Sequence, residues 1–88
     1  MKISQGFILR EIAGSYVVVP VGKNLVDFTS VITTNETGAF LWNNLQNETT
    51  LEELCQKLMA EYEGITKDEA LRDITEFTNA LKEKNILE

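Results

Sequence analysis

Apolar residues follow two different periods along the chain, and the change comes near residue 35. Up to that point β-branched and aromatic residues dominate, which is typical of strands. Two such runs, residues 7–12 and 16–19, are separated by Ala13 and Gly14, and this arrangement predicts a β-hairpin. Residues 26–33 predict a third strand, because three of the apolar side chains there share one face at period two.

From residue 36 onward the apolar residues recur at intervals of three and four, which predicts helices. We expect three of them, over residues 36–46, 51–63 and 67–84. Each begins after a good capping side chain, and the second and third starts match the capping-box pattern of Thr followed three residues later by Glu. The capping residues are Asn35, Thr50 and Thr66.

Large apolar side chains on the helical stripes define the expected core. Trp42 and Phe77 are predicted anchors, because aromatic side chains of this size are difficult to leave exposed in a small domain. Cys55 lies on the stripe of the second helix, so we expect a core residue rather than a reactive thiol. Ile86 and Leu87 form a short apolar tail that is expected to pack on this core. The rest of the second stripe is Leu51, Leu54, Leu58, Met59 and Tyr62.

The length of 88 residues allows one domain with a single core. The predicted fold class is therefore α+β, with three antiparallel strands followed by three helices in one domain over residues 1–88. No apolar run approaches the roughly 20 residues that span a bilayer. Residues 1–10 lack the apolar core of a signal peptide. We therefore expect a cytoplasmic protein without a membrane partner.

The chain contains no histidine and one cysteine. It therefore lacks an imidazole general base and cannot build a thiolate zinc cage or an internal disulfide. No glycine-rich phosphate loop or spaced cluster of carboxylate ligands is present in the sequence. These features favour a binding domain over an enzyme, with no catalytic residue, no metal and no cofactor.

The net charge is −6, and the negative charge is concentrated in the helical half of the chain. Such a surface repels phosphate backbones, so nucleic acid is not an expected partner. The predicted third strand, in contrast, carries no charge and no proline between Phe28 and Thr33. A small sheet exposes backbone groups at its edges, so this strand is expected to be covered by the fold or to pair with a peptide.

The start of the first helix has a distinctive sequence. Residues 35–39 are Asn-Glu-Thr-Gly-Ala, they lead into an apolar helix, and the helix start at residues 50–54 and the segment 73–77 follow at a regular distance. From about residue 7 to residue 87, this arrangement resembles the PqqD family. Two positions depart from its pattern: Thr78 replaces a usual apolar residue, and Asn85 replaces a usual glycine.

The PqqD-like proteins are RiPP recognition elements, domains with a winged helix-turn-helix-like fold that bind the leader segment of a ribosomally made precursor peptide. The resemblance implies that the leader adds as an antiparallel strand beside the third strand, against the third helix. It also implies presentation to a modifying enzyme, often of radical SAM type. The matching peptide-binding residues are Phe28, Thr29, Ser30, Val31, Ile32 and Thr33 on the strand, and Leu71, Ile74, Thr75 and Thr78 on the helix.

Alternative roles remain open for the helix residues. Leu71 and Ile74 lie on the apolar stripe, where packing in the core is the competing role. Thr75 and Thr78 flank the stripe, where plain solvent exposure competes with a place at the margin of the groove.

Two other functions compete at the level of the whole domain. Two capped helices joined by a turn that contains glycine are also typical of a winged helix DNA-binding regulator, although the third helix lacks the net positive charge that such helices present. A free sheet edge can also pair with a second copy, as in a scaffold that forms a weak or swapped homodimer rather than a monomer.

Overall fold

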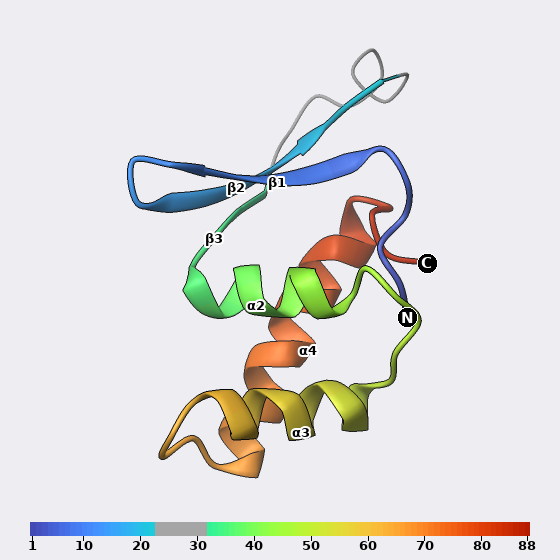
Figure 1. Cartoon of the computed structure of the whole chain (residues 1–88). Coiled ribbons are helices and arrows are strands. Elements are labelled where there is room, and N and C mark those ends of the chain that lie inside the picture. Colours follow the sequence, from blue (N-terminus) through green and yellow to red (C-terminus); the bar gives the residue numbers. More distant parts are fainter. Residues whose placement is uncertain (23–31) are drawn as a thin grey trace.

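The computed structural model describes residues 1–22 and 32–88. Within these ranges, an antiparallel sheet lies on one side of the molecule and the helices lie on the other (Figure 1). The elements follow in the order expected for the predicted α+β fold, and a winged helix-turn-helix-like description is compatible with them. They are β1 (Phe7–Ile12), β2 (Ser15–Pro20), β3 (Ile32–Thr34), α2 (Glu36–Asn44), α3 (Leu51–Glu61) and α4 (Lys67–Glu83).

The predicted hairpin is confirmed. β1 and β2 pair antiparallel, and Ile12 lies opposite Ser15, so two residues make the turn. Ala13 and Gly14 have φ angles of 51° and 83°, as a type I′ turn requires at both central positions. This turn geometry fixes the register of the hairpin.

β3 pairs antiparallel with β2 and is an edge of the sheet, whose order is β1-β2-β3. The prediction placed the third strand over residues 26–33, and the described part of the strand extends one residue further, to Thr34. The predicted residues before Ile32, which include Phe28, Thr29, Ser30 and Val31, lie outside the described residues.

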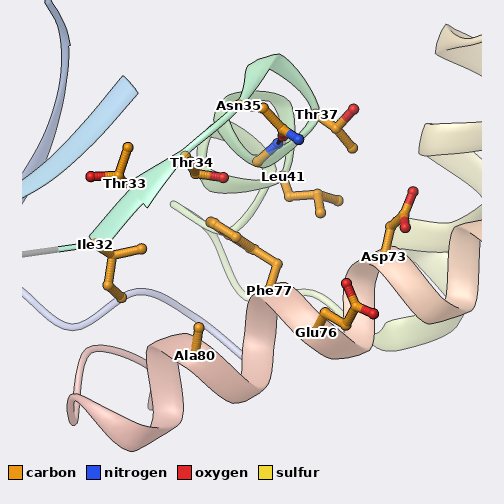
Figure 2. A pocket seen from close by; sticks show the side chains of 11 residues that line it. Ile32, Thr33, Thr34, Asn35, Thr37, Leu41, Asp73, Glu76, Phe77 and Ala80 are labelled. Atoms are coloured by element: carbon orange, nitrogen blue, oxygen red, sulfur yellow. Dashed lines mark hydrogen bonds between the residues drawn. The ribbon is translucent and has the colours of Figure 1, made fainter. Parts of the chain in front are cut away.

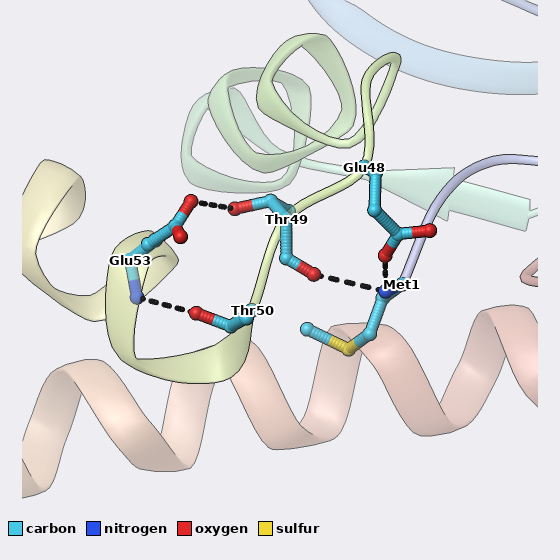
Figure 3. Close-up of polar contacts among 5 residues, drawn as sticks. All are labelled: Met1, Glu48, Thr49, Thr50 and Glu53. Carbon is cyan, nitrogen blue, oxygen red and sulfur yellow. Dashed lines mark hydrogen bonds and ion pairs between the residues drawn. The ribbon is translucent and has the colours of Figure 1, made fainter.

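The three helix starts agree with the prediction, because capping side chains mark them. Asn35 accepts a hydrogen bond from the Gly38 backbone N–H at 2.9 Å, and Thr66 with Glu69 forms a complete capping box. The box predicted at Thr50 is only half correct. Thr50 accepts from the backbone N–H of Glu53, but the Glu53 carboxylate accepts from the Thr49 hydroxyl instead of the Thr50 backbone (Figure 3).

α4 runs from α3 toward the sheet (Figure 1), and its buried side chains belong to the core. The predicted anchors Trp42 and Phe77 are 3% and 9% exposed, which confirms their burial. Cys55 is also buried, and its Sγ lies 3.9 Å from the Sδ of Met59. Among the described residues, the largest fully buried side chains are Leu41, Leu45, Leu54, Leu58, Ile74, Leu81, Ile86 and Val18.

The end of α4 explains the departure from the usual glycine at residue 85. Asn85 has φ = 60°, a left-handed conformation that asparagine tolerates better than most residues. Its N–H donates to the Lys82 carbonyl at 3.0 Å, and the N–H of Ile86 donates to the Leu81 carbonyl at 2.9 Å. This pair of bonds is a Schellman motif, and it turns the buried Ile86 onto the core as the apolar tail predicts.

The first residues are tied to segments far away in the sequence, which the hydrophobic pattern does not predict. The α-amino group of Met1 donates to the Glu48 carboxylate and to the Thr49 carbonyl (Figure 3). Ile3 forms an antiparallel bridge with Leu87. Residues 1–4 therefore connect the linker between α2 and α3 with the tail after α4, and they help to close the core.

Candidate functional site

A pocket of about 270 Å³ opens between the edge strand β3, the start of α2, and α4 (Figure 2). We call it the β3–α4 groove. Its strand side consists of residues 32–34, its floor comes from the start of α2 and from Leu41, and its other wall is one face of α4. The described residues that line it are Ile32, Thr33, Thr34, Asn35, Thr37, Gly38, Leu41, Asp73, Glu76, Phe77 and Ala80.

The strand side of the groove offers backbone hydrogen-bonding groups. Val17 of β2 lies opposite Thr33, and Val18 lies opposite Ile32. Because the N–H and C=O groups of successive residues in a strand point to opposite edges, only part of the β3 backbone can be used by β2. The remaining groups lie along the edge of β3 away from β2, where an additional strand can pair with them.

The floor of the groove depends on a close approach between β3 and α2. A Cβ placed on Gly38 would lie 1.8 Å from Thr34 Oγ1 and 2.8 Å from Thr34 Cβ. No side chain fits at that distance, so glycine permits α2 to start directly beneath the strand. Two residues of the Asn-Glu-Thr-Gly-Ala segment therefore have a structural role: Asn35 caps the helix, and Gly38 leaves space for the Thr34 side chain.

The α4 wall combines an apolar part with two carboxylates. Phe77 and Ala80 provide the apolar surface, and Asp73 and Glu76 lie beside them on the same wall (Figure 2). The Asp73 carboxylate is 3.6 Å from Nε of Arg72; the Arg72 side chain is exposed, and that of Asp73 is half-buried. Glu76 is exposed as well. None of the described lining residues is basic, so the wall presents negative charge to any ligand in the groove.

The helix residues expected at the groove lie elsewhere on α4. Ile74 is completely buried and belongs to the core. Thr78 does not flank the buried stripe as expected: it is 4% exposed, and its hydroxyl donates to the Thr75 carbonyl at 3.2 Å, so its polar group is satisfied inside the domain. Thr75 is exposed. Of the ten predicted peptide-binding residues, Ile32 and Thr33 are among the described residues that line the groove.

Leu71 lines a different pocket, of about 410 Å³, which lies between α3 and α4. We call it the α3–α4 pocket. Two residues that the sequence assigned to the buried stripe of α3, Leu51 and Met59, are 42% and 40% exposed here. They lie with Cys55 at intervals of four along α3, on the side that faces the pocket. The described lining residues are Leu51, Glu52, Cys55, Gln56, Met59, Lys67 and Leu71.

Three groups with shifted pKa values lie outside both linings, and each shift has a structural cause. The ammonium group of Met1 lowers the pKa of Glu48. The Thr66 backbone N–H lowers the pKa of Glu69. Burial raises the pKa of Tyr62, whose ring packs edge-on against that of Phe40 with 5.9 Å between the ring centroids. The three shifts therefore come from an ion pair with the N-terminus, from a helix cap and from burial of an aromatic ring.

Metal sites and membrane spans require characteristic groupings of side chains and helices. In residues 1–22 and 32–88, no three cysteine, aspartate or glutamate side chains are grouped so as to hold a metal ion. Over the same ranges, no helix has the length and apolar character needed to cross a membrane. Every buried side-chain nitrogen or oxygen atom of the described residues has a hydrogen-bond partner.

Known proteins are similar to this chain in fold and in sequence family. The fold is similar to a solved structure of TbiB1 in complex with the TbiA(beta) leader peptide, with a TM-score of 0.74 and 25% sequence identity. The similarity covers 100% of this chain and 95% of TbiB1. No curated protein matches the sequence. Residues 8–87 match the family described as coenzyme PQQ synthesis protein D (PqqD). Because that match covers nearly the whole sequence, the chain belongs to the PqqD family.

Proposed function

We propose that this chain is a non-catalytic recognition domain that binds the leader segment of a ribosomally synthesised precursor peptide in the β3–α4 groove. The leader adds as an antiparallel strand to the free edge of β3, and its side chains pack against α4. The observation that carries this proposal is an edge strand beside a groove, in a member of a family whose fold is shared by a leader-bound protein.

The available backbone groups limit what strand addition alone contributes. β3 has three described residues, and alternate residues face outward, so one or two of them offer about two to four hydrogen bonds. At roughly 0.5–1.5 kcal/mol net for each bond, they supply about 1–6 kcal/mol. Micromolar affinity requires about 8 kcal/mol.

Side chains in the groove must therefore contribute the rest. Burial of one leucine- or phenylalanine-sized side chain contributes roughly 1.5–3 kcal/mol. Phe77, Ala80 and Ile32 provide the apolar surface for such a side chain. The proposed leader consequently carries at least one apolar anchor that points into the groove.

The partner that follows from this role is a modifying enzyme, to which the domain presents the bound leader. We expect a radical SAM enzyme acting in the cytoplasm. A short precursor gene and such an enzyme gene next to the gene of this chain would support the proposal. Copurification of the tagged chain with that enzyme, dependent on the leader, is the corresponding biochemical test.

Strand addition has a signature that other docking modes lack. A synthetic leader from the neighbouring precursor is N-methylated at one backbone position at a time, and binding is measured by fluorescence anisotropy. Methylation at alternate positions is expected to abolish binding, because only those N–H groups donate to β3. Methylation at the intervening positions should leave the affinity close to that of the parent peptide.

A titration followed by NMR tests the location. We expect the amides of residues 32–34 to shift when the leader is added, and the outward-facing amides among them to become protected from exchange. Shifts confined to the exposed face of α3, or an affinity that does not alternate along the methylated series, would contradict strand addition. Formation of a dimer through β3 would appear instead as shifts that depend on protein concentration without peptide.

A further inference from the structure

The α4 wall of the β3–α4 groove combines apolar and acidic side chains. On the basis of the proposed function, we infer that the groove selects leader segments in which a lysine or arginine lies two residues before an apolar anchor. The apolar side chain packs against Phe77 and Ala80, and the cation lies against Asp73 and Glu76.

The charge of the wall is the first observation. Asp73 and Glu76 both line the groove, whereas none of the described lining residues is a lysine or arginine. Arg72 is the neighbouring cation, but it points to solvent with 63% of its side chain exposed, and its Nε is 3.6 Å from Asp73. Arg72 therefore interacts only weakly with the Asp73 carboxylate, and Glu76 has no ion pair among the described residues.

The spacing along α4 is the second observation. Residues 73, 76, 77 and 80 recur at intervals of three and four, so they form one face of the helix. From Asp73 to Phe77 the helix rises by about 6 Å. In a strand, side chains two residues apart on the same face are separated by about 6.6–6.8 Å. One peptide side chain can therefore lie beside Phe77 while the next on that face lies beside Asp73.

The direction of the groove sets the order of the two side chains. Figure 2 shows Ala80 at the end of the groove near Ile32, and Asp73 at the end near Thr37. β3 runs from Ile32 toward Thr34, so a leader antiparallel to it enters beside Asp73 and leaves beside Ala80. The cation is then the earlier residue of the pair, and the motif is a basic residue, any residue, and an apolar residue.

General attraction between an acidic protein and basic peptides has to be separated from this selection, because the chain has a net charge of −6. Glu63 and Glu83 are exposed and lie outside the groove lining. The double variant Glu63→Gln/Glu83→Gln therefore has the same net charge as Asp73→Asn/Glu76→Gln. Any difference between these two variants comes from the position of the carboxylates.

The test is a selection of short random peptides by mRNA display against the immobilised full chain at low ionic strength, where exposed charges are least screened. The parent chain and both double variants are used in parallel. Selected peptides are resynthesised, subjected to the N-methyl scan, and measured by fluorescence anisotropy. Peptides in which the lysine or arginine is replaced by glutamine are then compared with the originals on each protein.

We expect the basic residue two positions before the apolar anchor to be enriched on the parent chain and on Glu63→Gln/Glu83→Gln, but not on Asp73→Asn/Glu76→Gln. Replacing the cation in the peptide should weaken binding to the parent chain roughly two- to fivefold, the range of exposed ion pairs, and should have no further effect on the groove variant.

Two other outcomes overturn different statements. The inference would be overturned, and the proposed function left intact, if the selected strand-adding peptides showed no preference for a cation. The same holds if the apolar residue preceded the cation, or if the preference persisted on Asp73→Asn/Glu76→Gln. A selection that yields no peptide with an alternating N-methyl pattern would overturn the proposed function and the inference together.

Discussion

α4 separates two hollows of different character, the β3–α4 groove and the α3–α4 pocket. The pocket is larger, at about 410 Å³ against 270 Å³, and its exposed apolar residues make its lining the more hydrophobic of the two. Yet both of its walls are helices, whose backbone hydrogen bonds are closed within the helix. The groove has a strand edge as one wall, so a peptide can bind there through its backbone as well as through its side chains.

Under the proposed function, the smaller of the two hollows is the one that binds the peptide, so volume does not identify the peptide site. Directional backbone groups fix the register and direction of a ligand, whereas a patch such as Leu51 and Met59 fixes neither. Charge adds a second distinction, because the described groove lining has two carboxylates and no basic residue, while the pocket lining has Glu52 together with Lys67.

The largest effect is expected from Phe77→Ala, because Phe77 lines the groove and also packs in the core. Removing a buried phenylalanine costs about 3–5 kcal/mol of unfolding free energy. On the pocket side, Leu71→Ala truncates a half-buried side chain and should cost roughly 1–2 kcal/mol. Urea unfolding of both variants measures the difference. Equal losses would show that the two sides of α4 contribute alike to stability.

Gly38→Ala should affect only the groove side, by about 1–3 kcal/mol, because the new Cβ overlaps Thr34. Alanine ordinarily stabilises a helix relative to glycine, so a loss of stability identifies the contact as the cause. Thr34→Ala removes the Oγ1 and Cγ2 atoms that the Cβ meets. In the double variant the loss should therefore be smaller than the sum of the two single losses, and an additive result would rule out the proposed overlap.

A smaller effect is expected at the start of α4. Thr66→Ala removes the cap and should cost about 1 kcal/mol. Glu69 completes the box by accepting from the Thr66 backbone N–H at 3.1 Å, which lowers its pKa below the ordinary value of 4.5. A lowered pKa stabilises the fold above pH 4.5, and this contribution is lost as the pH falls through the folded pKa. Glu69→Ala should therefore destabilise more at pH 7 than at pH 3, as thermal unfolding at the two pH values can show.

The sequence predicts the elements well where a side chain marks them. Asn35, Thr50 and Thr66 define the three helix starts to the residue. The helix ends are predicted less accurately. α3 stops at Glu61 instead of residue 63, because Tyr62 adopts an extended conformation and its ring packs against Phe40 from another helix. Such a contact depends on the tertiary structure, so local periodicity does not contain it.

The groove wall is missed for a related reason. Asp73, Glu76, Phe77 and Ala80 share one helix face, but their mixed polarity hides that face from a hydrophobicity pattern. The apolar stripe predicts Ile74 as buried and says nothing about which flank of the stripe faces β3. That choice depends on how α4 crosses the sheet. A search for any face at intervals of three and four, regardless of polarity, would have included these residues.

The smallest effect is expected in the α3–α4 pocket, where Met59→Gln replaces a side chain that is 40% exposed. The change removes little buried surface, so stability should fall by less than about 1 kcal/mol. If peptides bind only along β3, the affinity of a selected strand-adding peptide should stay within about twofold of the parent value, a difference below roughly 0.5 kcal/mol. Anisotropy titrations of Met59→Gln and Asp73→Asn/Glu76→Gln with the same peptide make the comparison direct. A loss of affinity in Met59→Gln as large as in the groove variant would mean that the peptide extends across α4 into the α3–α4 pocket, and the functional distinction between the two sides of α4 would not hold.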